Sequence, residues 1–252
     1  MNIAVITGAS SGLGLEYTKA VCDMYPDIEQ IWIIARRKDR LDAVKAELGE
    51  KIVPMCFDIT DLTSVEKYAE QLNEKNANVK LLINNAGFGK LGDFDTLTTA
   101  DNAGMVRLNC EALTVMSSVT LPYMQSGAEI INSCSIASFA PNTRMAVYSS
   151  TKAFVMSLSR AMRSELKKRQ INVLAVCPGP MDTEFLAVAN IQKGASHTFD
   201  TLPRVNAKTM AVKSLKASKK HRAVYTNRLF YKFYRLLAKL LPHSLVMKIS
   251  GT

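Results

Sequence analysis

The sequence predicts an α/β protein built on a doubly wound parallel sheet of about seven strands, with helices on both faces. Short runs rich in β-branched residues alternate with longer segments of helical periodicity, which is the pattern of βαβ units. Most of these short runs are continuously apolar, as strands covered on both faces must be. No repeat or Pro/Gly-rich boundary divides the 252 residues, so we expect one domain over 1–252.

The expected strands are short and follow one another at similar intervals: 3–7, 30–35, 52–58, 81–84, 130–133, 172–177 and 222–226. Helical periodicity fills the longer gaps between them, at 15–24, 40–48, 64–74 and 153–168. Right-handed crossovers would place the ligand crevice at the carboxyl ends of the strands. The segment from 178 to about 205 opens with Pro-Gly-Pro and breaks this rhythm, so we expect a substrate loop there.

Composition and cysteine usage exclude several classes of protein. Hydrophobic residues make up 48% of the chain, which is typical of a globular protein and not of a disordered one. No run of about 18 uncharged apolar residues occurs, so we expect no membrane-spanning helix. The five cysteines form no close pair and the three histidines lie far apart, so neither a disulfide framework nor a metal site is expected. We expect a cytoplasmic protein, and the chain begins with an apolar strand and no charged leader.

Positive charge is concentrated at the C-terminal end. Residues 201–252 contain twelve Lys/Arg and no Asp or Glu, whereas the first 200 residues hold 20 bases against 22 acids. Such a segment is typical of a solvated face or of a surface for an acidic partner. No recognised nucleic-acid-reading motif accompanies the basic residues, so no nucleic acid partner is expected.

The same region predicts a basic amphipathic helical extension over about 227–250. Its cations recur at spacings of four, three and four, with leucine and phenylalanine at the other positions: Arg228, Lys232, Arg235 and Lys239. The helix would be capped by Thr226 or Asn227 and would end before Pro242. We favour packing beside the substrate cleft or at a dimer interface over peripheral contact with an anionic membrane surface.

A glycine-rich turn joins the first expected strand to the first expected helix, with the sequence Gly8-Ala9-Ser10-Ser11-Gly12-Leu13-Gly14. Glycines let the backbone turn tightly and approach a pyrophosphate, which the N–H groups of a helix N-terminus attract. A tight turn without a ligand is the alternative interpretation. The strand before it and the helix after it favour a dinucleotide site.

The end of the second strand indicates which dinucleotide would bind. An acidic residue at this position would bind the ribose 2′-hydroxyl of NAD, but the chain reads Arg36-Arg37-Lys38. Guanidinium groups suit a 2′-phosphate, so NADP(H) is preferred over NAD(H). The alternative is an ordinary basic start to a surface helix.

A tyrosine and a lysine at i and i+4, Tyr148 and Lys152, would share one face of a helix. A tyrosine of ordinary pKa, about 10, is a poor acid or base at neutral pH, and a neighbouring cation lowers that pKa. Ser135 would add a hydrogen bond to a carbonyl oxygen. Alone, such a Tyr–Lys pair is common and more often carries no chemistry.

Together these motifs resemble the short-chain dehydrogenase/reductase family, in its ordinary single-domain branch with a Rossmann-type fold. The matching features are a Thr-Gly-x-x-x-Gly-x-Gly turn at 7–14, Asn-Asn-Ala-Gly at 84–87, a serine thirteen residues before the tyrosine, Tyr148-x-x-x-Lys152, and Pro178-Gly179 followed by Thr183. The resemblance covers roughly residues 2 to 190, and the motifs occur in the expected order.

The resemblance implies an NADP(H)-dependent oxidoreductase that reduces a carbonyl or oxidises a secondary alcohol. Tyr148 would be the general acid/base, and Ser135 would position and polarise the substrate oxygen. Lys152 would hold the nicotinamide ribose and lower the pKa of Tyr148, while Asn109 would hold a water in the proton relay. No residue is expected to bind a metal.

The resemblance also implies a set of cofactor-binding residues: Gly8, Ser10, Ser11, Gly12, Leu13, Gly14, Arg36, Arg37, Asp58, Ile59, Asn85, Ala86, Gly87, Tyr148, Lys152, Pro178, Gly179 and Thr183. Many NADP-preferring relatives carry a basic residue at the position of Ser11. Recognition of the phosphate would therefore depend on Arg36 and Arg37.

Apolar residues next to these motifs are candidates for a substrate pocket: Phe88, Phe139, Met145, Met181 and Phe185. Such a lining favours an apolar ketone, an acyl chain or a steroid-like substrate, although ordinary core packing is equally open. Family habit implies a homodimer or homotetramer. A catalytically silent NADP(H)-binding sensor on the same fold is the alternative, and a membrane or nucleic-acid binder is a third. The intact serine, tyrosine and lysine set argues against a sensor.

Overall fold

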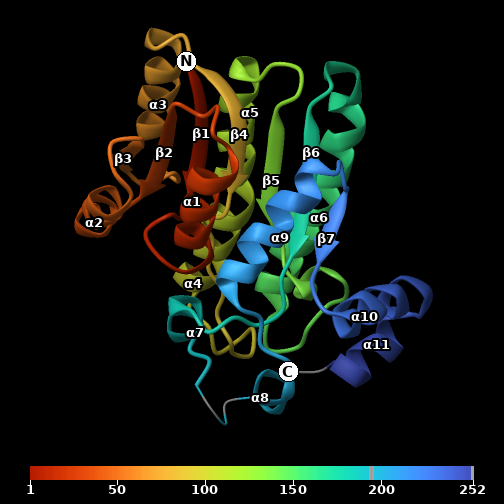
Figure 1. Cartoon of the computed structure of the whole chain (residues 1–252). Helices are drawn as coiled ribbons and strands as arrows, with labels where there is room; N and C mark the ends of the chain where they lie inside the picture. The colour runs from red at the N-terminus through yellow and green to blue at the C-terminus, as the bar shows by residue number, and fades with distance from the viewer. Residues whose placement is uncertain (193, 195, 251–252) are drawn as a thin grey trace.

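A computed structural model describes the backbone of residues 1–192, 194 and 196–250. Its described part contains one seven-stranded parallel sheet in the order β3-β2-β1-β4-β5-β6-β7 (Figure 1). The strands are β1 Asn2–Thr7, β2 Gln30–Ala35, β3 Ile52–Cys56, β4 Asn78–Asn84, β5 Glu129–Ser133, β6 Asn172–Cys177 and β7 Val224–Thr226. The predicted fold class is therefore confirmed, with β3 and β7 shorter and β4 longer than expected.

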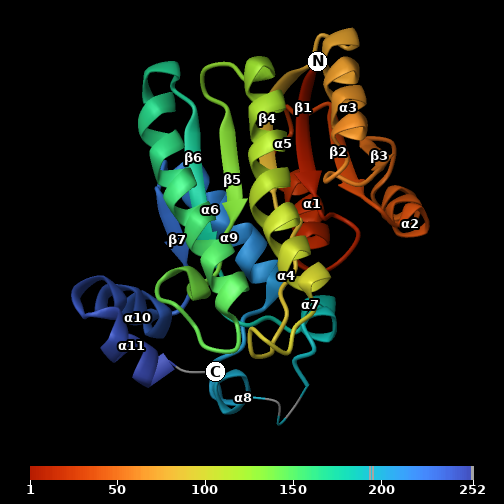
Figure 2. The ribbon, with the colours of Figure 1, turned by 180° about the vertical axis from the view of Figure 1, so that it is seen from behind.

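Helices cover both faces of the sheet (Figure 1, Figure 2). One face carries α1 Gly12–Met24, α2 Lys38–Leu48 and α9 Ala207–Lys219. The other carries α3 Leu62–Glu74, α4 Thr99–Val106, the π-helical segment η1 Arg107–Ala112, α5 Leu113–Thr120 and α6 Ala146–Glu165. Two separate apolar cores result, one under each helical layer.

The central strand β1 shows why these strands are apolar without alternation. Ile3 and Val5 pack into the core under α3 and α5, whereas Ala4 and Ile6 pack into the core under α1 and α9. Successive side chains of a strand point to opposite faces of the sheet. Because both faces are covered, all four side chains are fully buried.

Helix α6 begins at Ala146, seven residues before the predicted start at 153. Tyr148 and Lys152 therefore both lie in its first two turns, at the carboxyl edge of the sheet. The helix continues to Glu165 and packs along β6. Its first turns are thus held by the body of the molecule and not by a loop.

The predicted loop after β6 contains two short helices, α7 Glu184–Val188 and α8 His197–Thr201. The C-terminal extension forms α10 Leu229–Leu240, which ends before Pro242 as predicted, and α11 His243–Ser250. The predicted cap was wrong: the N-cap of α10 is Arg228, and Thr226 instead donates its hydroxyl to the Cys177 carbonyl at 2.6 Å. All four helices lie at the carboxyl edge (Figure 1).

Within the residues that the structure describes, no helix is both long enough and apolar enough to cross a bilayer.

Candidate active site

A cavity of about 1090 Å³ lies across the carboxyl ends of the strands. It is lined by the turn after β1 and by the segments that follow β2, β3, β4, β5 and β6. Helices α6 and α10 complete the lining. Of the residues proposed from sequence for catalysis, cofactor or substrate, all line it except Gly14, Asn109 and Phe139.

The glycine turn approaches its neighbours too closely for side chains. Gly8 and Gly12 have positive φ angles of 68° and 54°, which disfavour L side chains. A Cβ on Gly14 would lie 2.2 Å from the Gly8 carbonyl oxygen, so Gly14 packs the start of α1 against the turn and does not face the cavity. The backbone at the mouth of the turn is thus exposed to a ligand at the N-terminus of α1, as a pyrophosphate requires.

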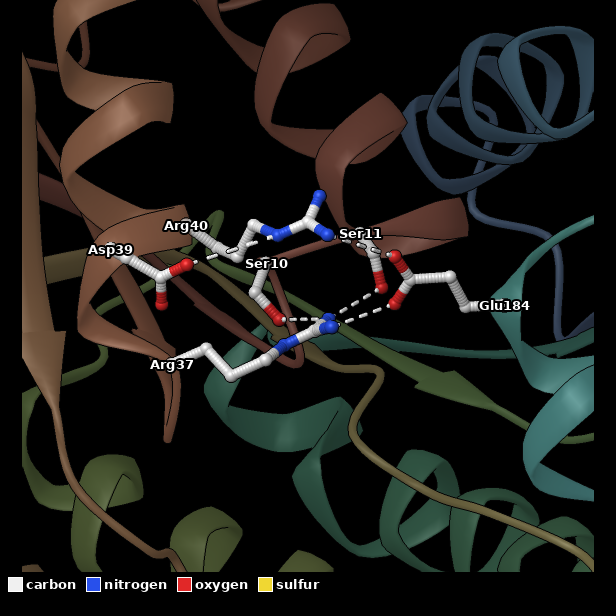
Figure 3. A network of polar contacts seen from close by, with 6 residues as sticks. All are labelled: Ser10, Ser11, Arg37, Asp39, Arg40 and Glu184. Atoms are coloured by element: carbon white, nitrogen blue, oxygen red, sulfur yellow. Dashed lines mark hydrogen bonds and ion pairs between the residues drawn. The ribbon is translucent and has the colours of Figure 1, made fainter.

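A cluster of hydroxyl and guanidinium groups forms an anion site beside this turn (Figure 3). Arg37 donates to the hydroxyls of Ser10 at 3.0 Å and Ser11 at 3.1 Å. Arg40, one turn further along α2, approaches the same site. Arg36 instead points to Asp58, with 3.6 Å between guanidinium and carboxylate. Of the two predicted arginines, Arg37 is therefore the one beside the turn.

The carboxylate of Glu184, the first residue of α7, lies in this anion site (Figure 3). It is 2.9 Å from Arg37 and 3.8 Å from Arg40. The hydrogen bond from Arg37 holds the pKa of Glu184 below its usual value, and a bond with Ser11 adds to the effect. The protein's own anion thus contacts the groups that an incoming phosphate would need. Sequence reasoning missed Glu184 because it lies almost 150 residues from Arg37.

The tyrosine, lysine and serine come together at the inner end of the cavity. The Lys152 ammonium lies 5.7 Å from the centre of the Tyr148 ring and donates to the Ser133 carbonyl at 2.8 Å. The hydroxyl of Ser135 is hydrogen bonded with Tyr148 and accepts from the backbone N–H of Ala137 at 3.1 Å.

The other nearby serine, Ser133, points elsewhere: its hydroxyl donates to the Asn85 side chain at 3.2 Å.

Burial is the largest influence on the pKa values of Tyr148 and Lys152. It raises the pKa of Tyr148 to about 12, and the hydrogen bond with Ser135 is the effect that opposes it. Burial also lowers the pKa of Lys152. The expected lowering of the Tyr148 pKa by Lys152 is not seen here, and burial is the largest influence on this pKa. The Tyr148 hydroxyl is therefore protonated at neutral pH.

Asn109 lies in η1 and does not line the cavity; it hydrogen bonds to residues beside it. Its amide accepts from the Phe88 N–H at 3.0 Å and donates to the Phe88 carbonyl at 2.8 Å and to the Thr151 hydroxyl at 3.0 Å. A Cβ on Gly87 would lie 2.8 Å from Asn109 and 3.4 Å from the Lys152 ammonium. Asn109 and Lys152 therefore both lie on the side of Gly87 to which a Cβ would project.

Many of the residues that line the cavity are apolar. Phe88, Met145, Met181 and Phe185 line it as proposed, whereas the Phe139 ring packs on Tyr234, 5.8 Å between centroids. Further apolar or aromatic residues were missed from sequence: Leu186, Val188, Phe199, Leu202, Phe230, Tyr231 and Tyr234. These come from the loop after β6 and from α10, and no motif marks them.

Tyr231 of α10 packs against the segment that follows β6 and lines the cavity. Its ring is fully buried, and its hydroxyl donates to the Pro203 carbonyl at 2.7 Å. A Cβ on Gly179 would lie 2.4 Å from this ring. The absence of a side chain at Gly179 therefore allows the first turn of α10 to pack against the segment after β6.

The parallel sheet, the glycine turn and the cavity at the carboxyl edge define a dinucleotide-binding protein of the Rossmann type. The family model for the short chain dehydrogenases matches residues 2–194. The chain belongs to this family, and it is an oxidoreductase of the short-chain dehydrogenase/reductase type.

Three relatives illustrate the similarity. An NADP-dependent 3-hydroxy acid dehydrogenase of Schizosaccharomyces pombe is 31% identical over 193 residues, 73% of each chain. A serine 3-dehydrogenase of Agrobacterium fabrum is 30% identical over 196 residues, 73% of this chain and 74% of that one. A solved short-chain dehydrogenase from Sphingobium yanoikuyae in complex with NADPH superposes with a TM-score of 0.81 at 28% identity, covering 95% of this chain and 94% of that one.

The contact between Gly179 and Tyr231 is testable by stability. We expect Gly179→Ala to lower the free energy of unfolding by about 1–3 kcal/mol, because the added methyl overlaps a buried ring that the Pro203 carbonyl holds. Urea unfolding of the variant and of the wild type measures this difference. In a Tyr231→Ala background the same substitution should cost much less, and an equal cost in both backgrounds would contradict the contact.

Proposed function

We propose that this protein is an NADP(H)-dependent carbonyl reductase, or secondary alcohol dehydrogenase, for an apolar ketone, acyl or steroid-like substrate. The single observation that carries the proposal is the meeting of Tyr148, Ser135 and Lys152 in the same cavity as the glycine turn and Arg37. A proton donor and a dinucleotide cradle in one cavity are the parts that this chemistry needs. The apolar lining residues support an apolar substrate.

The cofactor would lie along the carboxyl edge. Its pyrophosphate would face the glycine turn and the N-terminus of α1, and Ser10, Ser11 and Arg37 would hold the 2′-phosphate. Asp58 and Ile59 would face the adenine, with Asn85, Ala86 and Gly87 along the adenosine side. Pro178, Gly179 and Thr183 would face the nicotinamide. When bound, the cofactor supplies or accepts the hydride.

The chain's own residues would move the proton and hold the oxygen. In reduction, Tyr148 donates its phenolic proton to the substrate oxygen as negative charge develops there. Ser135 would exchange its hydrogen bond with Tyr148 for one donated to the substrate oxygen, while its own oxygen keeps accepting from the Ala137 N–H. Lys152, with Asn109 behind Gly87, would resupply the proton through water.

Two of the relatives named above support the cofactor proposal. The names of the fission yeast relative and of the Sphingobium structure carry NADP and NADPH. Family membership also supports a homodimer or homotetramer. A catalytically silent NADP(H) sensor is the rival; the serine, tyrosine and lysine arrangement favours an enzyme, because a sensor has no need of a buried proton donor.

The decisive experiment follows nucleotide absorbance with NADPH or NADH and a panel of ketones, acyl ketones, ketosteroids and quinones. We expect NADPH oxidation to exceed NADH oxidation. Tyr148→Phe should lower kcat by about 10²–10⁴-fold with unchanged NADPH affinity, because only the proton donor is lost. Tyr123→Phe is the control, since that hydroxyl donates to the Ala69 carbonyl away from the cavity.

Tight NADPH binding with no turnover of any compound would favour the sensor. Failure to bind either nucleotide would overturn the whole proposal.

A titration tests the protonation of Tyr148. The difference in phenolate absorbance between wild type and Tyr148→Phe should stay near zero at pH 10, where an ordinary tyrosine is about half ionised. The reason is that burial raises the pKa of Tyr148 to about 12, so the protonated form persists to higher pH. Half-ionisation at or below pH 10 in the free enzyme would mean that the charge of Lys152 outweighs burial.

Two substitutions test the anion site from opposite directions. Arg37→Ala should weaken NADPH binding roughly ten- to a hundredfold and leave NADH binding nearly unchanged, because a charge-assisted bond to phosphate is lost. Glu184→Gln should tighten NADPH binding about two- to fivefold, since the 2′-phosphate no longer displaces a carboxylate from Arg37. Calorimetry with each nucleotide measures both changes.

Lys45→Ala is the matched control, because it removes one positive charge from the same helix at its far end. Equal losses of NADPH binding in Lys45→Ala and Arg37→Ala would show a general field effect and contradict the site.

A further inference from the structure

We propose that α10 docks this protein on the surface of an anionic lipid bilayer, lying in the interface without crossing it. The helix has three distinct longitudinal faces, and one of them packs on the body of the molecule. Tyr231 and Ala238, seven residues apart, are buried against the body of the protein. The other two faces are a stripe of large apolar side chains and a row of cations.

The apolar stripe, which we call the outward face, consists of Leu229, Phe233, Leu236 and Leu240. These residues recur at spacings of four, three and four and therefore form one line along the helix. Their exposed fractions are 81%, 61%, 52% and 69%. Phe230 beside them and Leu245 on α11 are also exposed. So much large apolar surface on one short helix indicates a binding face.

The row of cations, which we call the basic flank, consists of Lys232, Arg235 and Lys239. These residues recur at spacings of three and four and lie along one side of the outward face. Arg228, the N-cap, instead donates to the Arg204 carbonyl at 2.6 Å. No acidic residue occurs in residues 201–252 to neutralise the basic flank. An apolar stripe beside a row of Lys and Arg matches the boundary of an anionic bilayer, where acyl chains lie below negatively charged headgroups.

Charge argues against a second copy of the chain as the occupant. In an antiparallel two-fold contact of two outward faces, the two basic flanks would lie side by side along the interface. Nothing acidic in residues 201–252 would compensate this repulsion. A lipid surface supplies negative charge along the whole length of the helix, and so it is the better match.

The orientation of α10 is determined by its buried side. Tyr231 packs on Gly179 and bonds to the Pro203 carbonyl, and Ala238 packs with Ala140 and with Val246 of α11. Both helices lie at the carboxyl edge of the sheet on the β7 side (Figure 1, Figure 2). Docking would therefore bring the cavity edge to the membrane and leave the opposite end of the sheet in water.

One side chain joins the exposed apolar surface to the cavity. Phe230 is 53% exposed and also lines the cavity, next to Tyr231 and Tyr234. This continuity adds a substrate class to the proposed function: a carbonyl compound dissolved in the bilayer, which would enter along α10. The substrate class rests on the proposed function. The docking surface itself does not depend on catalysis.

The test is co-sedimentation of the full chain with vesicles of phosphatidylcholine alone and of phosphatidylcholine mixed with phosphatidylglycerol. We expect binding to the anionic vesicles, weakened by salt, and at least about tenfold weaker binding to the neutral ones. Phe233→Ser/Leu240→Ser should lower binding to anionic vesicles by about tenfold or more, and Lys232→Gln/Lys239→Gln should remove most of its salt dependence. None of these four residues lines the cavity.

Two matched control variants make the same kinds of substitution outside α10. Phe94→Ser removes an exposed phenylalanine that lies outside α10, and Lys167→Gln/Lys168→Gln removes two cations from the short 3-10 helix Leu166–Arg169 that follows α6. Neither should change vesicle binding by more than about twofold. Circular dichroism and unfolding curves of every variant separate loss of docking from loss of fold.

Absence of vesicle binding at low salt, or equal binding by Phe233→Ser/Leu240→Ser and wild type, would overturn the proposal. So would a lipid-free oligomer, seen by sedimentation equilibrium, that this double substitution dissociates, because the outward face would then be a protein interface. Turnover is measured separately with a water-soluble and a bilayer-dissolved ketone. Vesicle binding without turnover of either would contradict the proposed function and leave the docking surface intact.

Discussion

The hydroxyl oxygen of Thr7 accepts hydrogen bonds from the backbone N–H groups of Asn85 and Ala86, at 3.0 and 3.1 Å. This contact joins the end of β1 to the end of β4, and further bonds continue along the carboxyl edge from there. The Asn85 side chain accepts from Ser133, whose carbonyl accepts from the Lys152 ammonium. The glycine turn, the middle of the sheet and the first turns of α6 are thus one connected network, in which displacement of one member disturbs the others.

The second constraint is steric and lies at the other end of the cavity. Gly179 leaves room for the buried ring of Tyr231, so the segment after β6 and α10 close together over the apolar part of the cavity. The hydrogen bond from Tyr231 to Pro203 ties the loop to the same helix. One aromatic side chain therefore connects the family's Pro-Gly motif to a C-terminal extension, while the outward face of α10 stays exposed.

Much of the fold could be predicted from sequence because its signals are local. Short, mostly apolar runs located all seven strands, and the turn beginning at Gly8 located one part of the cavity lining. Errors arose where local signals compete with packing. Helix α6 starts at Ala146 because its first turns pack at the sheet edge, and Thr226 bonds to Cys177 of the neighbouring strand and so does not cap α10. The direction of the Tyr148 pKa shift also depended on burial, which no motif reports.

The sequence by itself determined the parallel sheet, the glycine turn and the position of the tyrosine and lysine pair on one helix, since apolar runs, glycines and an i, i+4 pair act over a few neighbouring residues. It also determined that α10 has an apolar and a basic face. Only the tertiary structure decided that Glu184 contacts Arg37, and that the outward face of α10 is left uncovered while Tyr231 is buried. These outcomes depend on how segments far apart in the chain pack against one another, and spacing along the sequence carries no record of that packing.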